Sequence, residues 1–173
     1  ILNNININIP PNTFSVIMGK SGVGKTTFSN ILLGLLIPTS GNLFYGNQKI
    51  TKKNISSWKR KLSFVPQEVF IFNNTFKFNI TLKEHLNKNE IQKFNEIIKA
   101  TGLSEMISEL PNKENTIIEE NGISISGGQK QRVGLARAAF SKSEIIVFDE
   151  STSALDNDTE SKVLRYIHFL KKY

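Results

Sequence analysis

A glycine-rich octapeptide, Gly19–Thr26 (GKSGVGKT), constrains the fold of this chain more than any other feature. It matches the spacing G-x-x-x-x-G-K-[ST] and stands between a short apolar run, Phe14–Met18, and a segment of helical character, Lys25–Leu36. Glycines let a backbone wrap closely around a phosphate, and the positive N-terminus of the following helix also favours an anion. In this pattern the Lys25 ammonium reaches the β- and γ-phosphates and the Thr26 hydroxyl binds Mg²⁺. A glycine-rich hairpin turn is the alternative, and the flanking strand and helix argue against it.

A second motif is the apolar run Ile145–Phe148, which is followed by Asp149 and Glu150. A fully apolar strand is typical of a buried parallel sheet, and the ends of such strands line the ligand crevice. There Asp149 would hold Mg²⁺ through water, and Glu150 would polarise the attacking water as a general base. Taken alone, the acids after the strand are equally explained as an N-terminal cap for the segment that follows. Together with the glycine-rich loop, it predicts nucleotide hydrolysis.

The segment Ser126–Arg132 (SGGQKQR) predicts a second helix start that can bind an anion. Ser126 can cap a helix over Gly127–Ser141, and two glycines stand in its first turn. One chain with two such starts would either bind two phosphates or complete the site of another subunit. An ordinary glycine-flanked helix cap is the alternative.

Further patterns predict the rest of the secondary structure. A polar, largely helical block over residues 73–125 follows the first strands and reads as an inserted subdomain. Strand, loop and helix at the start, a helical insert and a late buried strand indicate an α/β nucleotide-binding domain. We expect strands over residues 1–9, 14–18, 43–45 and 62–65, and helices over residues 56–60, 89–100, 103–110 and 158–172.

Composition excludes several classes of site. The 173 residues, which fit one domain or one domain with a small subdomain, include no Cys, so no disulfide or Cys-ligated metal site can form. The only two histidines, His85 and His168, lie far apart, and the longest apolar run, Ile31–Ile37, is too short to cross a bilayer. The net charge of +7 comes mainly from 18 scattered Lys, beside 19 Asn and 22 Ile. This composition resembles A/T-rich codon bias, and we expect no dedicated nucleic-acid site.

Taken together, these motifs resemble the nucleotide-binding domain of an ATP-binding cassette (ABC) transporter. The resemblance implies a P-loop NTPase fold: a RecA-like core of mixed and parallel sheet with an antiparallel β edge (1–72 and 126–173) and an α-helical subdomain (73–125). The matching motifs are Walker A (Gly19–Thr26), the Q-loop (Gln67), the signature (Ser126–Gln129, with Ile125 in place of Leu), Walker B (Ile145–Asp149), the catalytic glutamate (Glu150) and the D-loop (Ser153–Asp156).

Finer marks are similar to the exporter branch of this family. They are Phe70–Phe72 and Asn74–Phe76 after the Q-loop, Thr116–Gly122 with Glu120 as an x-loop, and the D-loop sequence Ser-Ala-Leu-Asp at Ser153–Asp156. The resemblance thus implies an ATPase that powers export across a membrane. A soluble ABC ATPase acting on nucleic acid or ribosomes is one alternative, and an ATP-binding fragment deficient in hydrolysis is another. The cargo stays open among lipid-linked saccharides, lipids, peptides and drugs.

The resemblance also assigns site residues. Catalysis would rest on Glu150, Lys25 and Gln67, and Mg²⁺ would be held by Thr26, Gln67 and Asp149. The residues implied to bind ATP are Gly19, Lys20, Ser21, Gly22, Val23, Gly24, Lys25, Thr26, Thr27, Ser126, Gly127, Gly128 and Gln129.

The resemblance further implies partners and missing parts. A second nucleotide-binding domain would pair head to tail with ATP between the two, and a transmembrane domain fused upstream would hold the chain at the cytoplasmic face of the membrane. We expect a chain truncated at both ends, because the adenine-stacking aromatic would precede Ile1 and the switch histidine would follow Tyr173. Phe14 lies too close to Walker A for the first role, and His168 comes too early for the second.

Overall fold

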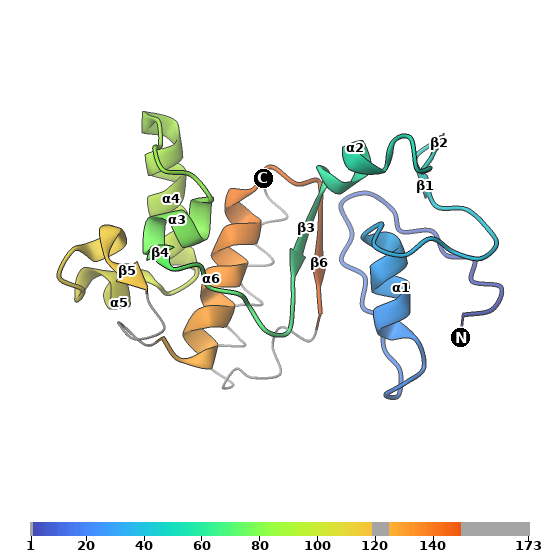
Figure 1. Ribbon diagram of the computed structural model, residues 1–173, viewed down its shortest axis with the longest axis horizontal. Helices are drawn as coiled ribbons and strands as arrows, with labels where there is room; N and C mark the ends of the chain where they lie inside the picture. Colours follow the sequence, from blue (N-terminus) through green and yellow to red (C-terminus); the bar gives the residue numbers. More distant parts are fainter. Residues whose placement is uncertain (1, 119–124, 150–173) are drawn as a thin grey trace.

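The computed structural model describes residues 2–118 and 125–149 (Figure 1). The expected helix 158–172, the D-loop and Glu150 lie outside these residues. The described elements, in chain order, are α1 (Lys25–Leu32), β1 (Phe44–Tyr45), β2 (Gln48–Lys49), α2 (Ile55–Lys59), β3 (Leu62–Val65), β4 (Asn74–Thr75), α3 (Phe76–Thr81), α4 (Lys88–Ala100), α5 (Ser104–Ser108), the 3₁₀ helix η1 (Lys113–Asn115), β5 (Ile117–Ile118), α6 (Gly127–Phe140) and β6 (Ile145–Phe148).

The central pair of strands is parallel, as predicted for Ile145–Phe148, and the strand predicted over Leu62–Val65 is its partner. β3 and β6 pair in register from Leu62 opposite Ile145 to Val65 opposite Phe148. The Asp149 N–H then donates to the Val65 carbonyl oxygen at 3.0 Å, which extends the ladder by one residue. Parallel strands need a long crossover, and here residues 66–144 supply it through the helical part of the chain. Both strands therefore end at the same edge.

Helix α6 lies between this strand pair and α3, α4 and α5 (Figure 1). One side of the helix packs into a core of buried apolar side chains from α3, α4, α5 and β5, including Phe76, Ile80, Phe94 and Ile107. The other side packs on the strands through Val65, Val69 and Ala138. A helix buried on two sides lacks a clear polar stripe, which explains its run of small and apolar residues.

The expected helix-rich block contains α3, α4 and α5 in the structure. Helix α4 begins with a capping box, in which the Glu90 N–H donates to the Asn87 side chain and Glu90 accepts from the Asn87 N–H. The short antiparallel pair β4–β5, with Asn74 opposite Ile118, was not predicted because two residues carry no detectable alternation. The subdomain boundaries at residues 73 and 125 stay a prediction.

Three expectations about the first part of the chain are wrong in the structure. Residues 2–20 contain no strand, although strands were expected over 1–9 and 14–18. Alternation supplies an apolar face, but a strand also needs a hydrogen-bonded neighbour, and none pairs with this segment in the described part of the chain. Helix α1 ends at Leu32 instead of Leu36, because Gly34 adopts a left-handed φ of 68° and closes a Schellman motif.

Within residues 2–118 and 125–149, no helix combines the length and the apolar character that a bilayer crossing needs.

Candidate nucleotide-binding site

The glycine-rich loop folds around the side chain of Lys25. The Lys25 ammonium donates to the carbonyl oxygens of Gly19 at 2.7 Å and Lys20 at 3.1 Å. Gly22 and Gly24 have φ values of 78° and 106°, which side chains with a Cβ rarely adopt. The loop conformation thus depends on the glycines of the motif.

Helix α1 starts directly from this loop. Gly24 is its N-cap and offers no side chain to the first turn, and that turn contains no acidic residue. The first N–H groups of a helix have no intrahelical partner, so they are free to bind an anion. Thr26 is exposed at this end, and Thr27 is half-buried. The loop and helix therefore have the features that phosphate binding needs.

The ends of β3 and β6 carry two further predicted residues. Asp149 follows β6 directly, and Gln67 lies two residues beyond β3. The loop before α1, the ends of both strands and the start of α6 all lie on the same side of the molecule, the lower side of Figure 1. No hydrogen bond or ion pair joins Lys25 to Asp149 or Gln67 within the described ranges. The structure therefore places the loop, the two strand ends and the start of α6 on one side of the molecule.

The predicted cap on α6 is present. The Gln129 N–H donates to Ser126 Oγ at 3.3 Å, and the Ser126 N–H donates to Gln129 Oε1 at 2.7 Å, which makes a capping box. The first turn of α6 contains no acidic residue, and a Cβ added at Gly127 would meet no atom within 4 Å. The signature segment thus forms a capped helix N-terminus without an acidic residue in its first turn.

Sequence reasoning missed two residues that connect parts of this site. Gln131 of α6 donates from Nε2 to the Gln67 carbonyl oxygen at 2.6 Å, and Arg137 of the same helix donates to the Phe70 carbonyl oxygen at 3.0 Å. The two polar residues stand six positions apart in a helix that is otherwise largely apolar after Arg132. A polar residue in such a run was the one sequence feature that pointed to them.

A charged cluster lies at the opposite ends of the strands. Glu144, just before β6, accepts hydrogen bonds from Lys61 and from the Tyr45 hydroxyl. These hydrogen bonds lower the pKa of Glu144, and the bond to Glu144 raises the pKa of both Tyr45 and Lys61. The cluster ties the β1–β2 hairpin to the start of the central strands, so its role is structural.

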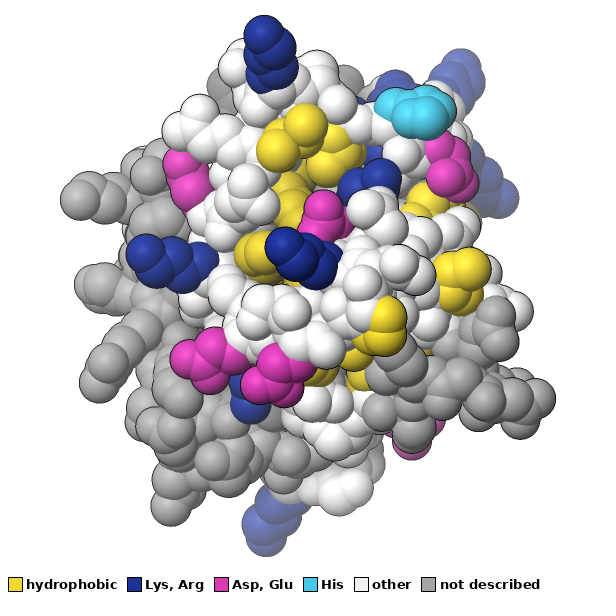
Figure 2. All heavy atoms as spheres, turned by 90° about the vertical axis from the view of Figure 1, so that its left-hand side faces the viewer, with side chains coloured by type: hydrophobic (Ala, Val, Ile, Leu, Met, Phe, Trp, Pro, Cys, Tyr) yellow, Lys and Arg dark blue, Asp and Glu magenta, His cyan; other side chains and the backbone are white. Residues whose placement is uncertain are grey.

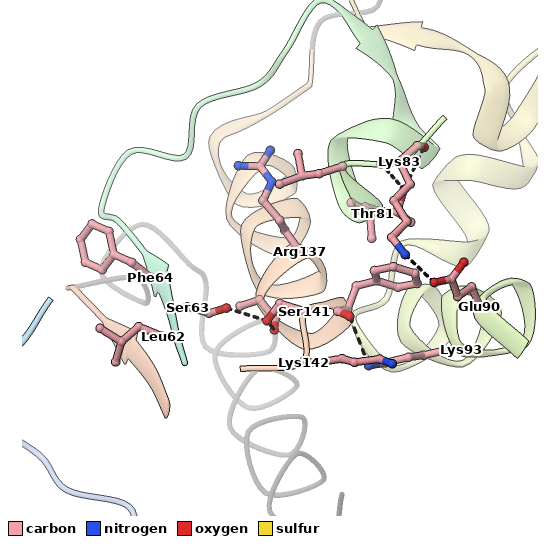
Figure 3. A pocket seen from close by; sticks show the side chains of 14 residues that line it. Leu62, Ser63, Phe64, Thr81, Lys83, Glu90, Lys93, Arg137, Ser141 and Lys142 are labelled. Carbon is pink, nitrogen blue, oxygen red and sulfur yellow. Dashed lines mark hydrogen bonds and ion pairs between the residues drawn. The ribbon is translucent and has the colours of Figure 1, made fainter. Parts of the chain in front are cut away.

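A cavity of about 400 Å³ lies between β3, α3, α4 and the end of α6 (Figure 3). Its lining includes an ion pair between Lys83 and Glu90, and Lys93, whose Nζ donates to the Phe140 carbonyl oxygen at 3.2 Å. Burial and the nearby Lys142 lower the pKa of Lys93. This cavity opens beside the beginning of β3, at the end opposite Asp149.

The outer face of the helical part carries both signs of charge. Figure 2 shows Lys and Arg side chains interspersed with Asp and Glu, with small apolar patches between them. Among the described residues, no group of three His, Cys, Asp or Glu gathers at one place.

Comparison with known proteins identifies the family. The family model described as ABC transporter matches residues 2–153. The chain is 40% identical over 172 residues, 99% of its length, to a Rickettsia bellii protein whose name describes an export ATP-binding/permease protein, of which it spans 29%. It is 38% identical over 167 residues, 96% of its length, to the mitochondrial iron-sulfur clusters transporter ATM1 of Debaryomyces hansenii, of which it spans 24%.

A solved structure agrees with these relatives. The structure of a bacterial Atm1-family ABC exporter with ATP bound superposes with a TM-score of 0.77 and 31% identity, covering 88% of this chain and 26% of that one. The chain spans less than a third of the length of these proteins. This likeness, the family match and the loop geometry around Lys25 lead to one conclusion: the chain belongs to the ABC transporter family and has its P-loop NTPase α/β fold.

Proposed function

We propose that this chain binds ATP together with Mg²⁺ and hydrolyses the ATP to power export across a membrane. The observation that carries the proposal is the glycine-rich loop closed around Lys25, on the same side as the ends of β3 and β6. In this arrangement the loop amides and the start of α1 would hold the phosphates. Lys25 would exchange its two carbonyl contacts for phosphate oxygens, which are stronger partners for an ammonium group.

The donor set near the loop fits Mg²⁺. The Thr26 hydroxyl, the Gln67 amide and the Asp149 carboxylate all offer oxygen, the ligand atom that this hard cation takes in proteins. When bound, the ion neutralises charge on the phosphates. Glu150, which follows Asp149, would accept a proton from the attacking water. The reaction would then depend on positioning and on charge stabilisation by Lys25 and the loop amides.

The start of α6 fits a role in trans. Its N-terminus and that of α1 lie on the same side of the molecule but on opposite sides of the β3–β6 pair (Figure 1). A second nucleotide-binding domain, arranged head to tail, would bring its own Ser126–Gln129 segment onto the ATP held by the loop of the first. Each ATP would then bridge two domains, and hydrolysis would release them.

A transmembrane domain is the other proposed partner, and it would hold the chain at the cytoplasmic face of the membrane. The Rickettsia relative is named for both an ATP-binding and a permease part. Near the Gln67 segment, Phe70 is 68% exposed and Ile117 is 49% exposed. Exposed apolar side chains such as these form a surface that a helix end of the membrane domain would cover. This surface and the helical segment 73–125 would receive the contact that couples ATP turnover to export.

The replacement Glu150→Gln in the intact protein tests this function. We expect the ATPase rate to fall roughly a hundredfold or more, because general-base catalysis contributes this much. The same variant keeps the ATP contacts, so ATP should shift it to a dimer in size-exclusion chromatography. Lys25→Ala is the control that loses ATP binding in calorimetry. An unchanged ATPase rate in the Glu150 variant would contradict its role, and a wild-type protein without ATPase activity would contradict the function itself.

A further inference from the structure

Helix α6 holds the segment that follows Gln67 through three hydrogen bonds to main-chain oxygens. Gln131 Nε2 donates to the Gln67 carbonyl oxygen at 2.6 Å. Arg137 donates from Nη2 to the Phe70 carbonyl oxygen at 3.0 Å and from Nε to the Asn79 carbonyl oxygen at 2.8 Å. All three acceptors are backbone atoms, so these contacts fix where the chain runs.

Asn79 closes the same segment from the other side. Its side chain is fully buried, accepts from the Phe72 N–H at 2.8 Å, and donates to the Phe72 carbonyl oxygen at 2.9 Å. The same amide group also donates to the carbonyl oxygens of Asn74 and Thr75. The Arg137 guanidinium lies 5.4 Å from the centre of the Phe72 ring. Residues 67–75 are therefore tied at both ends to one unit formed by α3 and α6.

The Gln131 side chain is retained at a cost in stability. It is 3% exposed, and its Oε1 is buried with no hydrogen-bond partner in the described part of the chain. A buried polar atom without a partner costs about 1–3 kcal/mol. Methionine has a similar length and would fill the same space without this cost.

We propose that Gln131 and Arg137 are positioning residues that fix the Gln67 segment to the helix beginning at Ser126. Gln67 then keeps its place relative to the ATP site because α6 holds its backbone. The catalytic consequence rests on the function proposed above, whereas the structural coupling can be measured without ATP. The competing explanation is that both side chains only stabilise the fold.

The variants Gln131→Met and Arg137→Lys separate these explanations. In the intact protein we expect kcat to fall roughly tenfold or more, because a small misplacement of a catalytic group slows turnover this strongly. The KM for ATP should stay within about twofold, since the loop around Lys25 is untouched. The Gln131 variant should keep or raise the melting temperature. The matched control is Gln92→Met, because Gln92 is exposed on α4 and its side chain hydrogen-bonds only to Glu96 among the described residues.

Hydrogen exchange followed by mass spectrometry gives a readout that needs no turnover. In both variants we expect the amides of residues 67–75 to exchange roughly tenfold faster, while the α1 amides keep their rate. Unchanged exchange in residues 67–75, an unchanged kcat, or a melting temperature that falls together with faster exchange throughout would overturn the proposal. If the wild-type protein hydrolyses no ATP, the proposed function fails, and the exchange rates still decide this inference.

Discussion

Two glycines of α6 differ in the space around them, and this difference predicts opposite effects on stability. A Cβ at Gly134 would lie 2.5 Å from Val69 Cγ2 and 3.4 Å from Val65 Cγ1, whereas a Cβ at Gly127 would meet nothing within 4 Å. Gly134→Ala should therefore overpack the contact with Val69 and Val65 and lower the free energy of unfolding by about 1–3 kcal/mol. Gly127→Ala should leave it unchanged or raise it by about 0.4–1 kcal/mol. Urea unfolding followed by circular dichroism measures both, and equal effects would contradict the packing argument.

Single residues also show what the sequence could predict of the site. The spacing of Gly19, Gly24 and Lys25 predicted a loop, and the positive φ of Gly24 and the Lys25 contacts agree with one. The roles of Gln131 and Arg137 could not be predicted, because a single sequence does not indicate which backbone carbonyl a polar side chain will bind. Their contacts join residues 64 and 67 positions apart. Only the folded chain brings such pairs together.

At the scale of elements, the N-terminus of α6 can be tested by changing its cap. Ser126→Ala removes the side-chain cap and should destabilise the chain by about 1 kcal/mol. Ser126→Asp keeps a good cap but places a carboxylate where the proposed phosphate would bind, so stability should be retained while the ATP-dependent dimer is lost. Thermal unfolding and size-exclusion chromatography of each variant in the Glu150→Gln background measure the two effects. An Asp variant that still dimerises with ATP would contradict the proposed contact.

The anchoring of the β1–β2 hairpin predicts a pH dependence. Hydrogen bonds from Lys61 and Tyr45 lower the pKa of Glu144 below its ordinary value of 4.5. A group with a lowered pKa in the folded state adds stability above its unfolded pKa, and that stability is lost as the pH falls through the folded value. The chain should thus lose stability more steeply than a Glu144→Gln variant as the pH falls below about 4.5. Parallel curves for the two proteins would show that the hydrogen bonds contribute nothing.

Elements were predictable where local pattern and tertiary packing agree. The Ser126 cap and the apolar Ile145–Phe148 run each carry their signal within a few residues, and both elements form within a residue of the predicted bounds. The strand expected over residues 1–9 rests on alternation alone, and its side chains Ile5, Ile7 and Ile9 remain exposed in the structure. Strand formation depends on a distant partner, which local sequence does not specify.

At the scale of the whole molecule, the positions of the α1 and α6 starts indicate whether one chain or two would form one ATP site. The starts of α1 and α6 share one side of the molecule but are separated by the central strands (Figure 1). In a single copy the strands lie between the two starts. In two copies placed head to tail, as proposed, the α6 start of one copy would instead face the α1 start of the other.

Complementation between two inactive variants decides between these arrangements. A Lys25→Ala copy keeps its α6 start, and a Ser126→Asp copy keeps its phosphate loop, so a mixed pair holds one intact composite site. In every mixed dimer one of the two sites is intact, so the mixture should recover ATPase activity of up to about half the wild-type rate, in proportion to the share of mixed dimers. Each variant alone should stay inactive. If both helix starts served the nucleotide of their own chain, neither copy would contain a complete site and mixing would restore nothing, which makes recovered activity the signature of a site shared between two chains.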